Sequence, residues 1–261
     1  MSATTDPLRL DEDLQARLRR AARAVVLSGA GVSRESGLDT FRGAGGLWEN
    51  QRPEDLATPE AFYRAPGQVW RWYAWRYARA AAAAPNPAHL ALVRWESLFP
   101  SFLLVTQNVD DLHQRAGSRR LVALHGTVAA AVCDACGRRR AMAEAVAASP
   151  DEPPACGAAG CGGRFRPAVV WFGENLPAAA LAQAAEAAAS CDLLVSVGTS
   201  SLVYPAAGLI ETALRRGARV IEVNPEPTPF SPRVHLRLAA PAGEALPALT
   251  EAIERCRSMP G

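Results

Sequence analysis

Four of the six cysteines occur in two close pairs, Cys133 with Cys136 and Cys156 with Cys161. The pattern is C-x2-C, nineteen intervening residues, then C-x4-C. Four thiolates in two pairs can complete the tetrahedral coordination that zinc prefers, and such a site keeps no open position for a reacting water. The spacing therefore predicts a structural zinc ion that folds a module too small to fold alone, with free thiols as the alternative.

A glycine-rich turn follows an apolar stretch near the start of the chain. The segment Ala24–Ser28 predicts a short buried strand, and Gly29 and Gly31 come directly after it. Glycines at such a turn let backbone N–H groups approach a phosphate, and a following helix would add its positive end. The match to the dinucleotide fingerprint is partial, because Arg34 occupies the third glycine position. A plain strand-to-helix turn fits the same residues.

Polar side chains follow the next predicted strands. Gln107, Asn108 and Asp110 stand directly after the apolar segment Phe102–Thr106, which favours a polar ligand site over packing. Asn108 or Asp110 could equally cap a helix. His125 ends the following apolar segment, and its ordinary pKa of roughly 6.5 suits a base near neutral pH. A lone histidine is more often structural, so both interpretations stay open at this point.

The elements that must position these residues alternate along the chain. Strands are expected at Ala24–Ser28, Phe102–Thr106, Leu121–Leu124, Asp192–Val197, Arg219–Val223 and Val234–Leu238. Helices are expected at Leu10–Ala22, Ala178–Ala189 and Pro205–Arg216. This order is typical of an α/β fold with a parallel sheet covered on both faces. Such sheets bind ligands at the carboxyl ends of their strands, where the motifs stand.

Two stretches interrupt this rhythm. Thr58–His89 is helical and rich in aromatic residues, which predicts an inserted helical subdomain. Thr127–Arg166 contains the cysteine pairs, a basic run and a segment rich in proline and glycine. It has little apolar content with which to form a core of its own.

Composition excludes several classes of protein. Of the 261 residues, 49% are hydrophobic and 21% are charged, which excludes a disordered, collagenous or coiled-coil chain. A net charge of +2 gives no case for a dedicated nucleic-acid binder. All 28 basic residues are arginine, so the chain has no lysine. We expect a cytoplasmic protein, because we find neither a membrane-spanning apolar segment nor a secretory leader.

Taken together and in this order, the motifs resemble those of the sirtuin family of NAD-dependent protein-lysine deacylases. The resemblance runs from about Val25 to about Ala245 and includes GAGVS, FRG, TQNVDDLH, HG, the cysteines, RPAVVWFGE, VGTSS and EVNPE. It implies a Rossmann-like parallel sheet with helices on both faces, plus a small domain made of a helical insertion and a four-cysteine zinc module. The NAD-binding domain would comprise residues 1–56, 90–126 and 167–261, the helical insertion residues 57–89, and the zinc module residues 127–166.

The resemblance also implies a set of site residues. His125 would be the general base, with Asn108 beside it. The residues that would line NAD, with Arg42 near the phosphates, are Gly29, Ala30, Gly31, Ser33, Phe41, Arg42, Trp48, Gln107, Asn108, Val109, Asp110, Gly198, Thr199, Ser200, Asn224, Pro225, Glu226 and Ala242. Without the resemblance, Arg42 could equally be a solvated arginine. Val170, Trp171, Phe172, Gly173 and Glu174 would pair as a strand with the substrate peptide, and Cys133, Cys136, Cys156 and Cys161 would hold one structural zinc ion.

The implied reaction transfers an acyl group from a protein lysine to NAD, and gives nicotinamide, free lysine and 2′-O-acyl-ADP-ribose. Tyr73 and Arg76 are three residues apart and share one face of a helix. In the family such a pair marks the branch that removes succinyl, malonyl and glutaryl groups, whose carboxylate matches a guanidinium. The alternative is an ordinary amphipathic helix with solvated arginines. Removal of acetyl groups would remain compatible with either.

Other functions stay open at the level of sequence. The alternatives are NAD-dependent ADP-ribosyl transfer to protein and non-catalytic binding of NAD or acylated peptides. We expect acylated lysine side chains as partners, no specific nucleic acid, no membrane, and a monomer. Asp39 and Arg34 depart from the wording usual in the family. The sequence assigns no role to Cys191 or Cys256.

Overall fold

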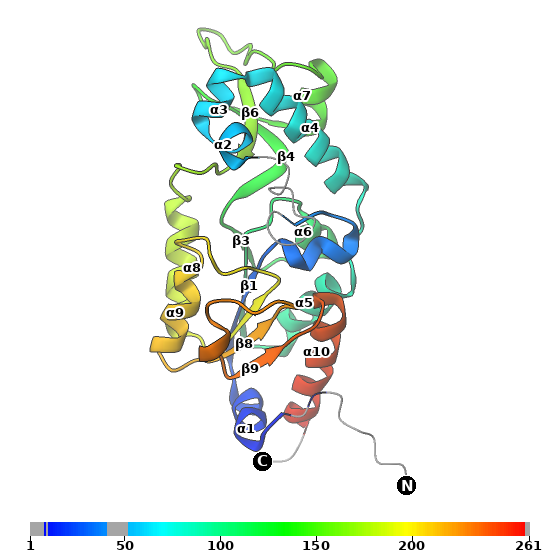
Figure 1. The fold of residues 1–261 in the computed structure, drawn as a ribbon, viewed down its shortest axis with the longest axis vertical. Helices are drawn as coiled ribbons and strands as arrows, with labels where there is room; N and C mark the ends of the chain where they lie inside the picture. Colours follow the sequence, from blue (N-terminus) through cyan, green and yellow to red (C-terminus); the bar gives the residue numbers. More distant parts are fainter. Residues whose placement is uncertain (1–7, 9, 41–51, 259–261) are drawn as a thin grey trace.

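The computed structural model describes residues 8, 10–40 and 52–258, and within them it holds two sheets, one large and one small (Figure 1). The large sheet has six parallel strands. In spatial order they are β3 (Leu121–Ala123), β2 (Ser101–Thr106), β1 (Arg23–Ser28), β7 (Leu193–Val197), β8 (Arg219–Val223) and β9 (Leu236–Leu238). The α/β prediction is confirmed, and each expected strand is present with ends shifted by at most two residues.

The strand order reverses between β1 and β7 at the centre of the sheet. From there the chain runs outward in both directions, which is the Rossmann-like arrangement that opens a crevice at the carboxyl ends of these two strands. Every residue of β7 and all but the first of β1 are buried. Their uninterrupted apolar sequences follow from this, since a strand covered on both faces has no side that needs polar residues.

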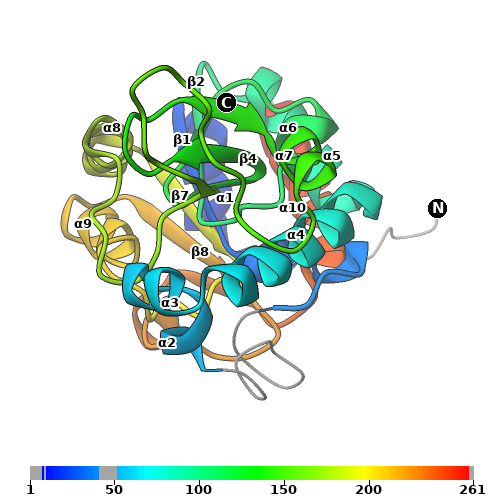
Figure 2. The same cartoon turned by 90° about the horizontal axis from the view of Figure 1, so that it is seen from above.

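Helices cover both faces of the large sheet. On one face α1 (Glu12–Arg20), α5 (Pro87–Leu98) and α10 (Ala242–Ser258) pack on Val26, Leu104 and Val195. On the other face lie α8 (Ala178–Ser190) and α9 (Gly208–Arg215), which pack on the side chains that alternate with those. Figure 2 shows the two layers on opposite sides of the strands. Among the described residues, none of the helices combines the length and apolar character needed to cross a bilayer.

The second sheet belongs to a small module at one end of the molecule (Figure 1). Its antiparallel strands lie in the order β5 (Arg139–Ala141), β4 (Gly126–Cys133) and β6 (Phe165–Val169). The helices of the module are α2 (Pro53–Leu56), α3 (Pro59–Arg64), α4 (Pro66–Ala82) and α7 (Met142–Ala148). The helical insertion and the cysteine-bearing stretch therefore fold as neighbours.

One apolar core joins the two parts of the module. Phe62 and Trp70 from the helical insertion pack in the same cluster as Met142, Phe165 and Cys133 from the cysteine-bearing stretch. Trp70 Nε1 also donates a hydrogen bond of 2.9 Å to the carbonyl oxygen of Ser149. The cysteine-bearing stretch thus gains from the helices the apolar surface that its own sequence lacks.

The expected division into domains stays a prediction. Two elements lie across its expected boundaries, and one helix begins later than expected. Helix α5 begins at Pro87 and packs on α10 of the large sheet, where Trp95 Nε1 donates to Thr250 Oγ1 at 2.8 Å. Strand β6 runs across the expected boundary at residue 166. Helix α9 begins at Gly208 and not at Pro205, so residues 203–207 form turns instead.

Candidate active site

A cavity of about 1070 Å³ opens at the carboxyl ends of the central strands, and the small module closes one side of it. The residues predicted to bind NAD that line it are Gly29, Ala30, Gly31, Gln107, Asn108, Val109, Gly198, Thr199, Ser200, Asn224, Pro225, Glu226 and Ala242. His125, Tyr73 and residues 170–174 line it as well. Ser33, Asp110 and Arg76 lie outside the lining. Phe41, Arg42 and Trp48 lie outside the described residues.

The glycine turn after β1 packs directly against the turn after β7. Gly29 N–H donates to Val197 O at 3.0 Å, and Gly31 N–H donates to Gly198 O at 2.8 Å. A Cβ on Gly31 would lie 2.7 Å from Gly198 Cα, and Gly198 has a φ of +59°. These glycines are required for the close approach of two turns, and both N–H groups are used within the protein. The N–H groups of these two glycines therefore donate within the protein, and not to a phosphate as the glycine pattern suggested. The element that follows is a 3₁₀ helix, η1 (Ala30–Ser36).

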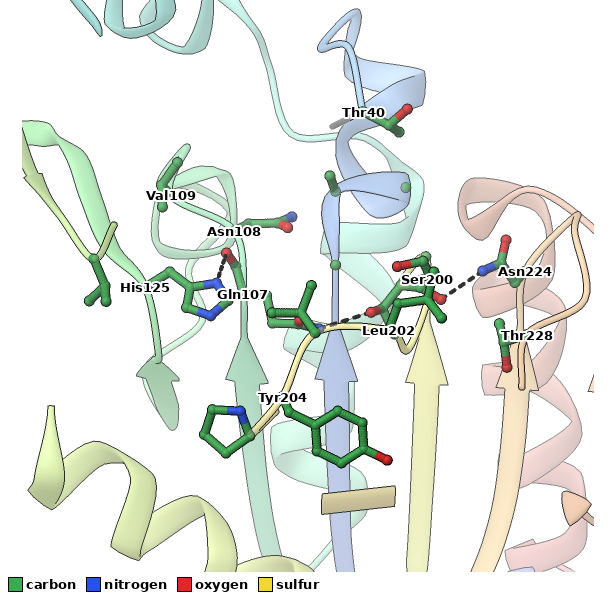
Figure 3. Close-up of a pocket in the computed structure, with 18 of the residues that line it drawn as sticks. Thr40, Gln107, Asn108, Val109, His125, Ser200, Leu202, Tyr204, Asn224 and Thr228 are labelled. Carbon is green, nitrogen blue, oxygen red and sulfur yellow. Dashed lines mark hydrogen bonds between the residues drawn. The ribbon is translucent and has the colours of Figure 1, made fainter. Parts of the chain in front are cut away.

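Hydrogen bonds connect the ends of four strands across the floor of the cavity, and one of them spans the end of β1 (Figure 3). His125 after β3 bonds to the carbonyl oxygen of Gln107 after β2 at 3.0 Å. Gln107 Nε2 donates to Thr199 Oγ1 after β7 at 3.0 Å, and Asn224 Nδ2 after β8 donates to Thr199 O at 2.8 Å. Since the four side chains come from segments far apart in sequence, the strand order alone brings them together.

The bond to Gln107 fixes the proton of His125. A carbonyl oxygen only accepts, so Nδ1 carries the hydrogen and Nε2 keeps its lone pair. Burial lowers the pKa of His125, and the bond to Gln107 opposes this only in part. The imidazole is therefore neutral near pH 7, with its basic nitrogen on a side chain that lines the cavity.

His125 also stands where the chain passes from the large sheet to the small one. Strand β3 ends at Ala123 and β4 begins at Gly126, whose φ is +77°. A Cβ on Gly126 would lie 2.1 Å from the carbonyl oxygen of Ala168. The carbonyl oxygen of His125 accepts a hydrogen bond of 2.9 Å from Val170 N–H. At His125 and Gly126 the chain therefore passes from the large sheet into the small module.

Asn108, which lines the cavity, is joined to Ser33 and Asp110 behind the lining by a buried chain of hydrogen bonds. Asn108 Nδ2 donates to Ser33 Oγ at 3.2 Å, and Ser33 Oγ donates to Asp110 Oδ2 at 2.7 Å. Asp110 Oδ1 accepts from the N–H of Leu112 at 3.0 Å, so this carboxylate also caps the start of α6 (Leu112–Ala116). Burial raises the pKa of Asp110. Asn108 Oδ1 is buried without a partner among the described residues, which leaves it an acceptor for a ligand.

Tyr73 and Arg76 lie on α4, with the tyrosine in the cavity wall. The Tyr73 hydroxyl oxygen accepts a hydrogen bond of 3.0 Å from Trp171 Nε1, and burial raises the pKa of Tyr73, so the hydroxyl keeps its proton. Arg76 is half-buried, and its guanidinium lies 5.7 Å from the ring centroid of Trp72. Burial lowers the pKa of Arg76, while Tyr73, Asp110 and Asp39 oppose that change. Asp39, which departs from the wording usual in the family, therefore places a carboxylate close enough to Arg76 to raise the pKa of its guanidinium.

The segment predicted to pair as a strand with a peptide is a turn in this structure. Strand β6 ends at Val169, Gly173 has a φ of +87°, and Glu174 N–H donates to Trp171 O at 3.0 Å. The Glu174 carboxylate turns back to accept from Trp171 N–H at 2.8 Å. Although burial alone raises the pKa of Glu174, the hydrogen bonds from Arg166 and Trp171 lower it overall. Phe172 remains 42% exposed beside the cavity.

Some residues that follow β7 and β1 line the cavity but were not predicted from the sequence. Leu202 and Tyr204 are exposed over 56% and 64% of their surface and line the cavity beside Val203. The SLVY run at residues 201–204, three residues after the strand-end Gly198, was the available indication. Arg34 also lines the cavity, and it is the one arginine among the described lining residues. It is therefore a cation available to an anionic ligand.

A buried carboxylate shapes the loop after β8. Glu222 is 1% exposed and accepts hydrogen bonds from the hydroxyls of Thr228 and Ser231. Arg237 Nε lies 3.3 Å from Glu222 Oε1, and Arg237 Nη2 donates to the carbonyl oxygen of Pro225 at 2.9 Å. Residues 224–229, which line the cavity, are thereby held from beneath.

The four paired cysteines come together in the small module, with their sulfur atoms all within 4.8 Å of one another. Two of the separations, Cys133 to Cys161 and Cys136 to Cys156, are 3.6 Å. A tetrahedral zinc with bonds of about 2.3 Å requires sulfur atoms roughly 3.8 Å apart, so the four thiolates fit the ion. None of the four cysteines is among the described residues that line the cavity.

The two cysteines outside the cluster, Cys191 and Cys256, are packing residues. Cys191 and Cys256 are buried in the cores on opposite faces of the large sheet. Burial raises the pKa of Cys191 to about 11, so its thiol keeps its proton. These surroundings are those of an inert cysteine.

The fold and the strand-end cavity define a Rossmann-type dinucleotide-binding protein with a metal-bearing second module. The Sir2 family model matches residues 29–205, and the chain belongs to this family. It is 53% identical over 239 residues to an "NAD-dependent protein deacylase" of Thermus thermophilus, covering 90% of this chain and 92% of the relative. It is 49% identical over 253 residues to "NAD-dependent protein deacylase 1" of Pseudomonas aeruginosa, covering 94% and 97%.

Solved structures agree with the sequence relatives. A Sir2 homologue in complex with NAD superimposes with a TM-score of 0.85 at 42% identity, covering 95% of this chain and 96% of that one. A mutant Sir2 homologue with 2′-O-acetyl-ADP-ribose gives a TM-score of 0.88 at 41% identity, covering 96% and 99%. The resemblance stated from the motifs is thus confirmed at the level of family and fold.

Proposed function

We propose that this chain is an NAD-dependent protein-lysine deacylase that gives nicotinamide, free lysine and 2′-O-acyl-ADP-ribose. The observation that carries the proposal is the neutral His125 at the strand-end cavity, with Nδ1 tied to Gln107 and Nε2 left as a base. The names of the curated relatives and the solved complexes with NAD and acetyl-ADP-ribose support the same activity.

NAD supplies a ribose carbon that accepts the acyl oxygen when nicotinamide leaves. The chain's part is to bind, orient and exclude water. Asn108 offers its free amide oxygen, and Ser33 and Asp110 behind it keep that amide in one orientation. His125 Nε2 would take a proton from a ribose hydroxyl, so that the hydroxyl oxygen can attack the former amide carbon. One water molecule then supplies the oxygen and hydrogen atoms needed to release the free lysine and 2′-O-acyl-ADP-ribose. Arg34 would face the phosphates, and the loop held by Glu222 would face the adenosine end.

The substrate lysine would enter between the small module and the turn after β7. Phe172 from one side and Leu202 and Tyr204 from the other present exposed apolar surface at the cavity. Such surface suits the aliphatic stem of an acyl-lysine.

We further propose that the preferred acyl groups end in a carboxylate, as succinyl and malonyl do. Tyr73 presents a protonated hydroxyl in the cavity wall, and Arg76 lies one helical turn further along α4. A hydroxyl and a guanidinium on one helix face can both bond to a carboxylate, whereas an acetyl group offers no atom to them. Acetyl removal would persist at a lower efficiency.

The remaining expectations belong to this proposal as well. We propose that zinc is structural, since a four-thiolate site is closed and stands apart from the cavity lining. Thiols kept as metal ligands suit a reducing compartment, which supports a cytoplasmic location. We propose a monomer, because one chain supplies both walls of the cavity.

The decisive experiment incubates acyl-lysine peptides carrying acetyl, succinyl, malonyl or glutaryl groups with the protein, with and without NAD, and reads the products by mass spectrometry. Deacylated peptide and O-acyl-ADP-ribose in equal amounts, only with NAD, are expected. ADP-ribose attached to protein without free O-acyl-ADP-ribose would instead indicate the alternative, ADP-ribosyl transfer. The absence of lysine in the chain removes self-acylation on side chains as a background.

A further inference from the structure

One arginine and one carboxylate hold the turn that follows β6. Arg166 Nη1 and Nη2 donate to Glu174 Oε1 and Oε2 at 2.5 and 2.9 Å, which is a bidentate pair. Arg166 Nη2 also donates to the carbonyl oxygen of Val169 at 3.0 Å. Glu174 Oε2 accepts from Trp171 N–H. The side chains of Arg166 and Glu174 are only 14% and 27% exposed, so water weakens the pair little.

This pair fixes the indole of Trp171. The guanidinium carbon of Arg166 lies 3.5 Å from the centroid of the Trp171 ring, as a cation stacked on an aromatic face does. Phe62 packs on the indole with ring centroids 5.3 Å apart. Trp171 is only 2% exposed. Its ring therefore has one orientation, and its N–H points in one direction.

The indole N–H reaches Tyr73. Trp171 Nε1 donates to the Tyr73 hydroxyl oxygen at 3.0 Å. The hydroxyl hydrogen of Tyr73 cannot point back along that bond, so it must point elsewhere, and Tyr73 lines the cavity. An accepted hydrogen bond also strengthens the hydroxyl as a donor. The hydroxyl is thus oriented as a donor toward whatever occupies the cavity.

We propose that Arg166, Glu174 and Trp171 are positioning residues for acyl selectivity, which hold the Tyr73 hydroxyl as a donor to the distal carboxylate of a dicarboxyl acyl group. This inference rests on the proposed deacylase function and its preference for such groups. An acetyl group has no distal acceptor, so loss of the relay should weaken acetyl removal less than succinyl removal. A succinyl group should lose one well-oriented hydrogen bond.

The first test is Trp171→Phe, which keeps an aromatic ring and removes the N–H. Because one hydrogen bond is at stake, we expect KM for a succinyl-lysine peptide to rise about three- to tenfold. We expect kcat/KM for the matching acetyl peptide to fall by less, so that the ratio of succinyl to acetyl kcat/KM decreases at least about threefold. Trp95→Phe is the matched control, since it removes an equally buried indole N–H from the core of the large sheet. It should lower thermal stability without altering the ratio of succinyl to acetyl activity.

A double-mutant cycle separates the relay from a general packing role. Tyr73→Phe removes the hydroxyl itself, and the Trp171→Phe change made on top of it should add less than about twofold to the succinyl KM. A full additional effect would mean that Trp171 acts without Tyr73, and the relay would be rejected.

Glu174→Gln provides a second variant should Trp171→Phe fail to fold, as judged by circular dichroism. It keeps an acceptor for Trp171 N–H and removes the charge that pairs with Arg166. We expect a smaller rise in the succinyl KM in the same direction, and a smaller loss of activity on the acetyl peptide than on the succinyl peptide. Equal losses on both peptides would overturn the proposal.

The proposed function and the relay can fail separately. If neither Tyr73→Phe nor Arg76→Met changes the succinyl-to-acetyl ratio, the preference for dicarboxyl groups is wrong and the relay falls with it. If those two variants change the ratio while Trp171→Phe and Glu174→Gln leave it unchanged, only the relay is wrong.

Discussion

The large sheet and the small module hold their sides of the cavity by different means. At the strand ends, backbone approaches backbone: Gly29 and Gly31 bond to the main chain at Val197 and Gly198 with no side chain between them. In the module, side chains form the wall: Arg166 holds Glu174 and Trp171, and Trp171 holds Tyr73. Main-chain contacts permit almost no substitution, whereas a side-chain relay can change residue by residue. Under the proposed function, the chemistry belongs to the large sheet and the choice of acyl group to the module.

The largest expected effect concerns the metal. Cys133→Ser removes one of four ligands at the end of β4, so zinc should be lost and the module should unfold first. Zinc binding contributes on the order of 10 kcal/mol to folding in comparable small modules. Metal analysis and limited proteolysis measure this, with Cys256→Ser as the control that keeps its zinc. A module that stays protease-resistant without metal would show that the shared apolar core suffices.

The second prediction tests the chemical side of the comparison. His125→Ala removes the base and its bond to Gln107 O, but leaves the hydrogen bonds that join Gln107, Thr199 and Asn224. We therefore expect kcat to fall about 10²- to 10⁴-fold for every acyl group alike. NAD binding, followed by calorimetry, should change little. His235→Ala changes a histidine that is absent from the described lining and should retain turnover. Turnover within tenfold of wild type in His125→Ala would reject the base assignment.

The third prediction tests the selective side. Arg76→Met keeps the length of the side chain and removes its charge, so kcat/KM for succinyl peptides should fall about 10- to 100-fold. Acetyl peptides should be affected by less than about threefold. Arg79→Met, one turn further along α4, is the matched control, because the Arg79 guanidinium is already engaged by the carbonyl oxygen of Gly37 at 2.9 Å. Parallel losses on both peptides would contradict an acyl pocket at this face.

The smallest predicted effect is an acid sensitivity of the large sheet. Burial lowers the pKa of His113 to about 3 and that of His89 to about 4, and their rings lie 4.8 Å apart beneath the strand ends. The unfolded chain binds protons below pH 6.5 that the folded protein excludes. The free energy of unfolding should therefore fall as pH decreases, by about 1.5 kcal/mol per histidine between pH 6.5 and 5.

Urea unfolding at the two pH values measures this slope. His113→Asn should reduce the decrease in unfolding free energy between the two pH values by the share of one histidine, about 1.5 kcal/mol, because its excluded proton no longer contributes. An unchanged slope would mean that other groups dominate acid unfolding.

The fold was largely predictable because its strands are buried on both faces. Continuous apolar runs such as DLLVSV have few alternatives when helices flank them. The antiparallel sheet of the module was not predicted, since GTVAAAVC has neither a clear alternation nor a continuous run of strand-favouring residues. There the shared core with α4 and the cysteine cluster decides the structure.

The site was predictable where its motifs are contiguous and not where contacts join distant segments. TQNVDD and HG pointed to the strand ends, but the order of strands that links His125, Gln107, Thr199 and Asn224 is a property of the whole sheet. No periodicity relates Arg166 to Glu174 or Trp171 to Tyr73. The turn at residues 171–174 was missed because its carboxylate folds back on its own backbone.

The double attachment of His125 has a geometric consequence. Its imidazole is fastened to Gln107 of the large sheet, and its carbonyl to Val170 of the module. A dinucleotide bound along the strand ends and a peptide bound against the module would then both be positioned relative to His125. The distance between the two reactants would then depend on the covalent geometry of His125. Small shifts in the packing of the module against the large sheet would change that distance little.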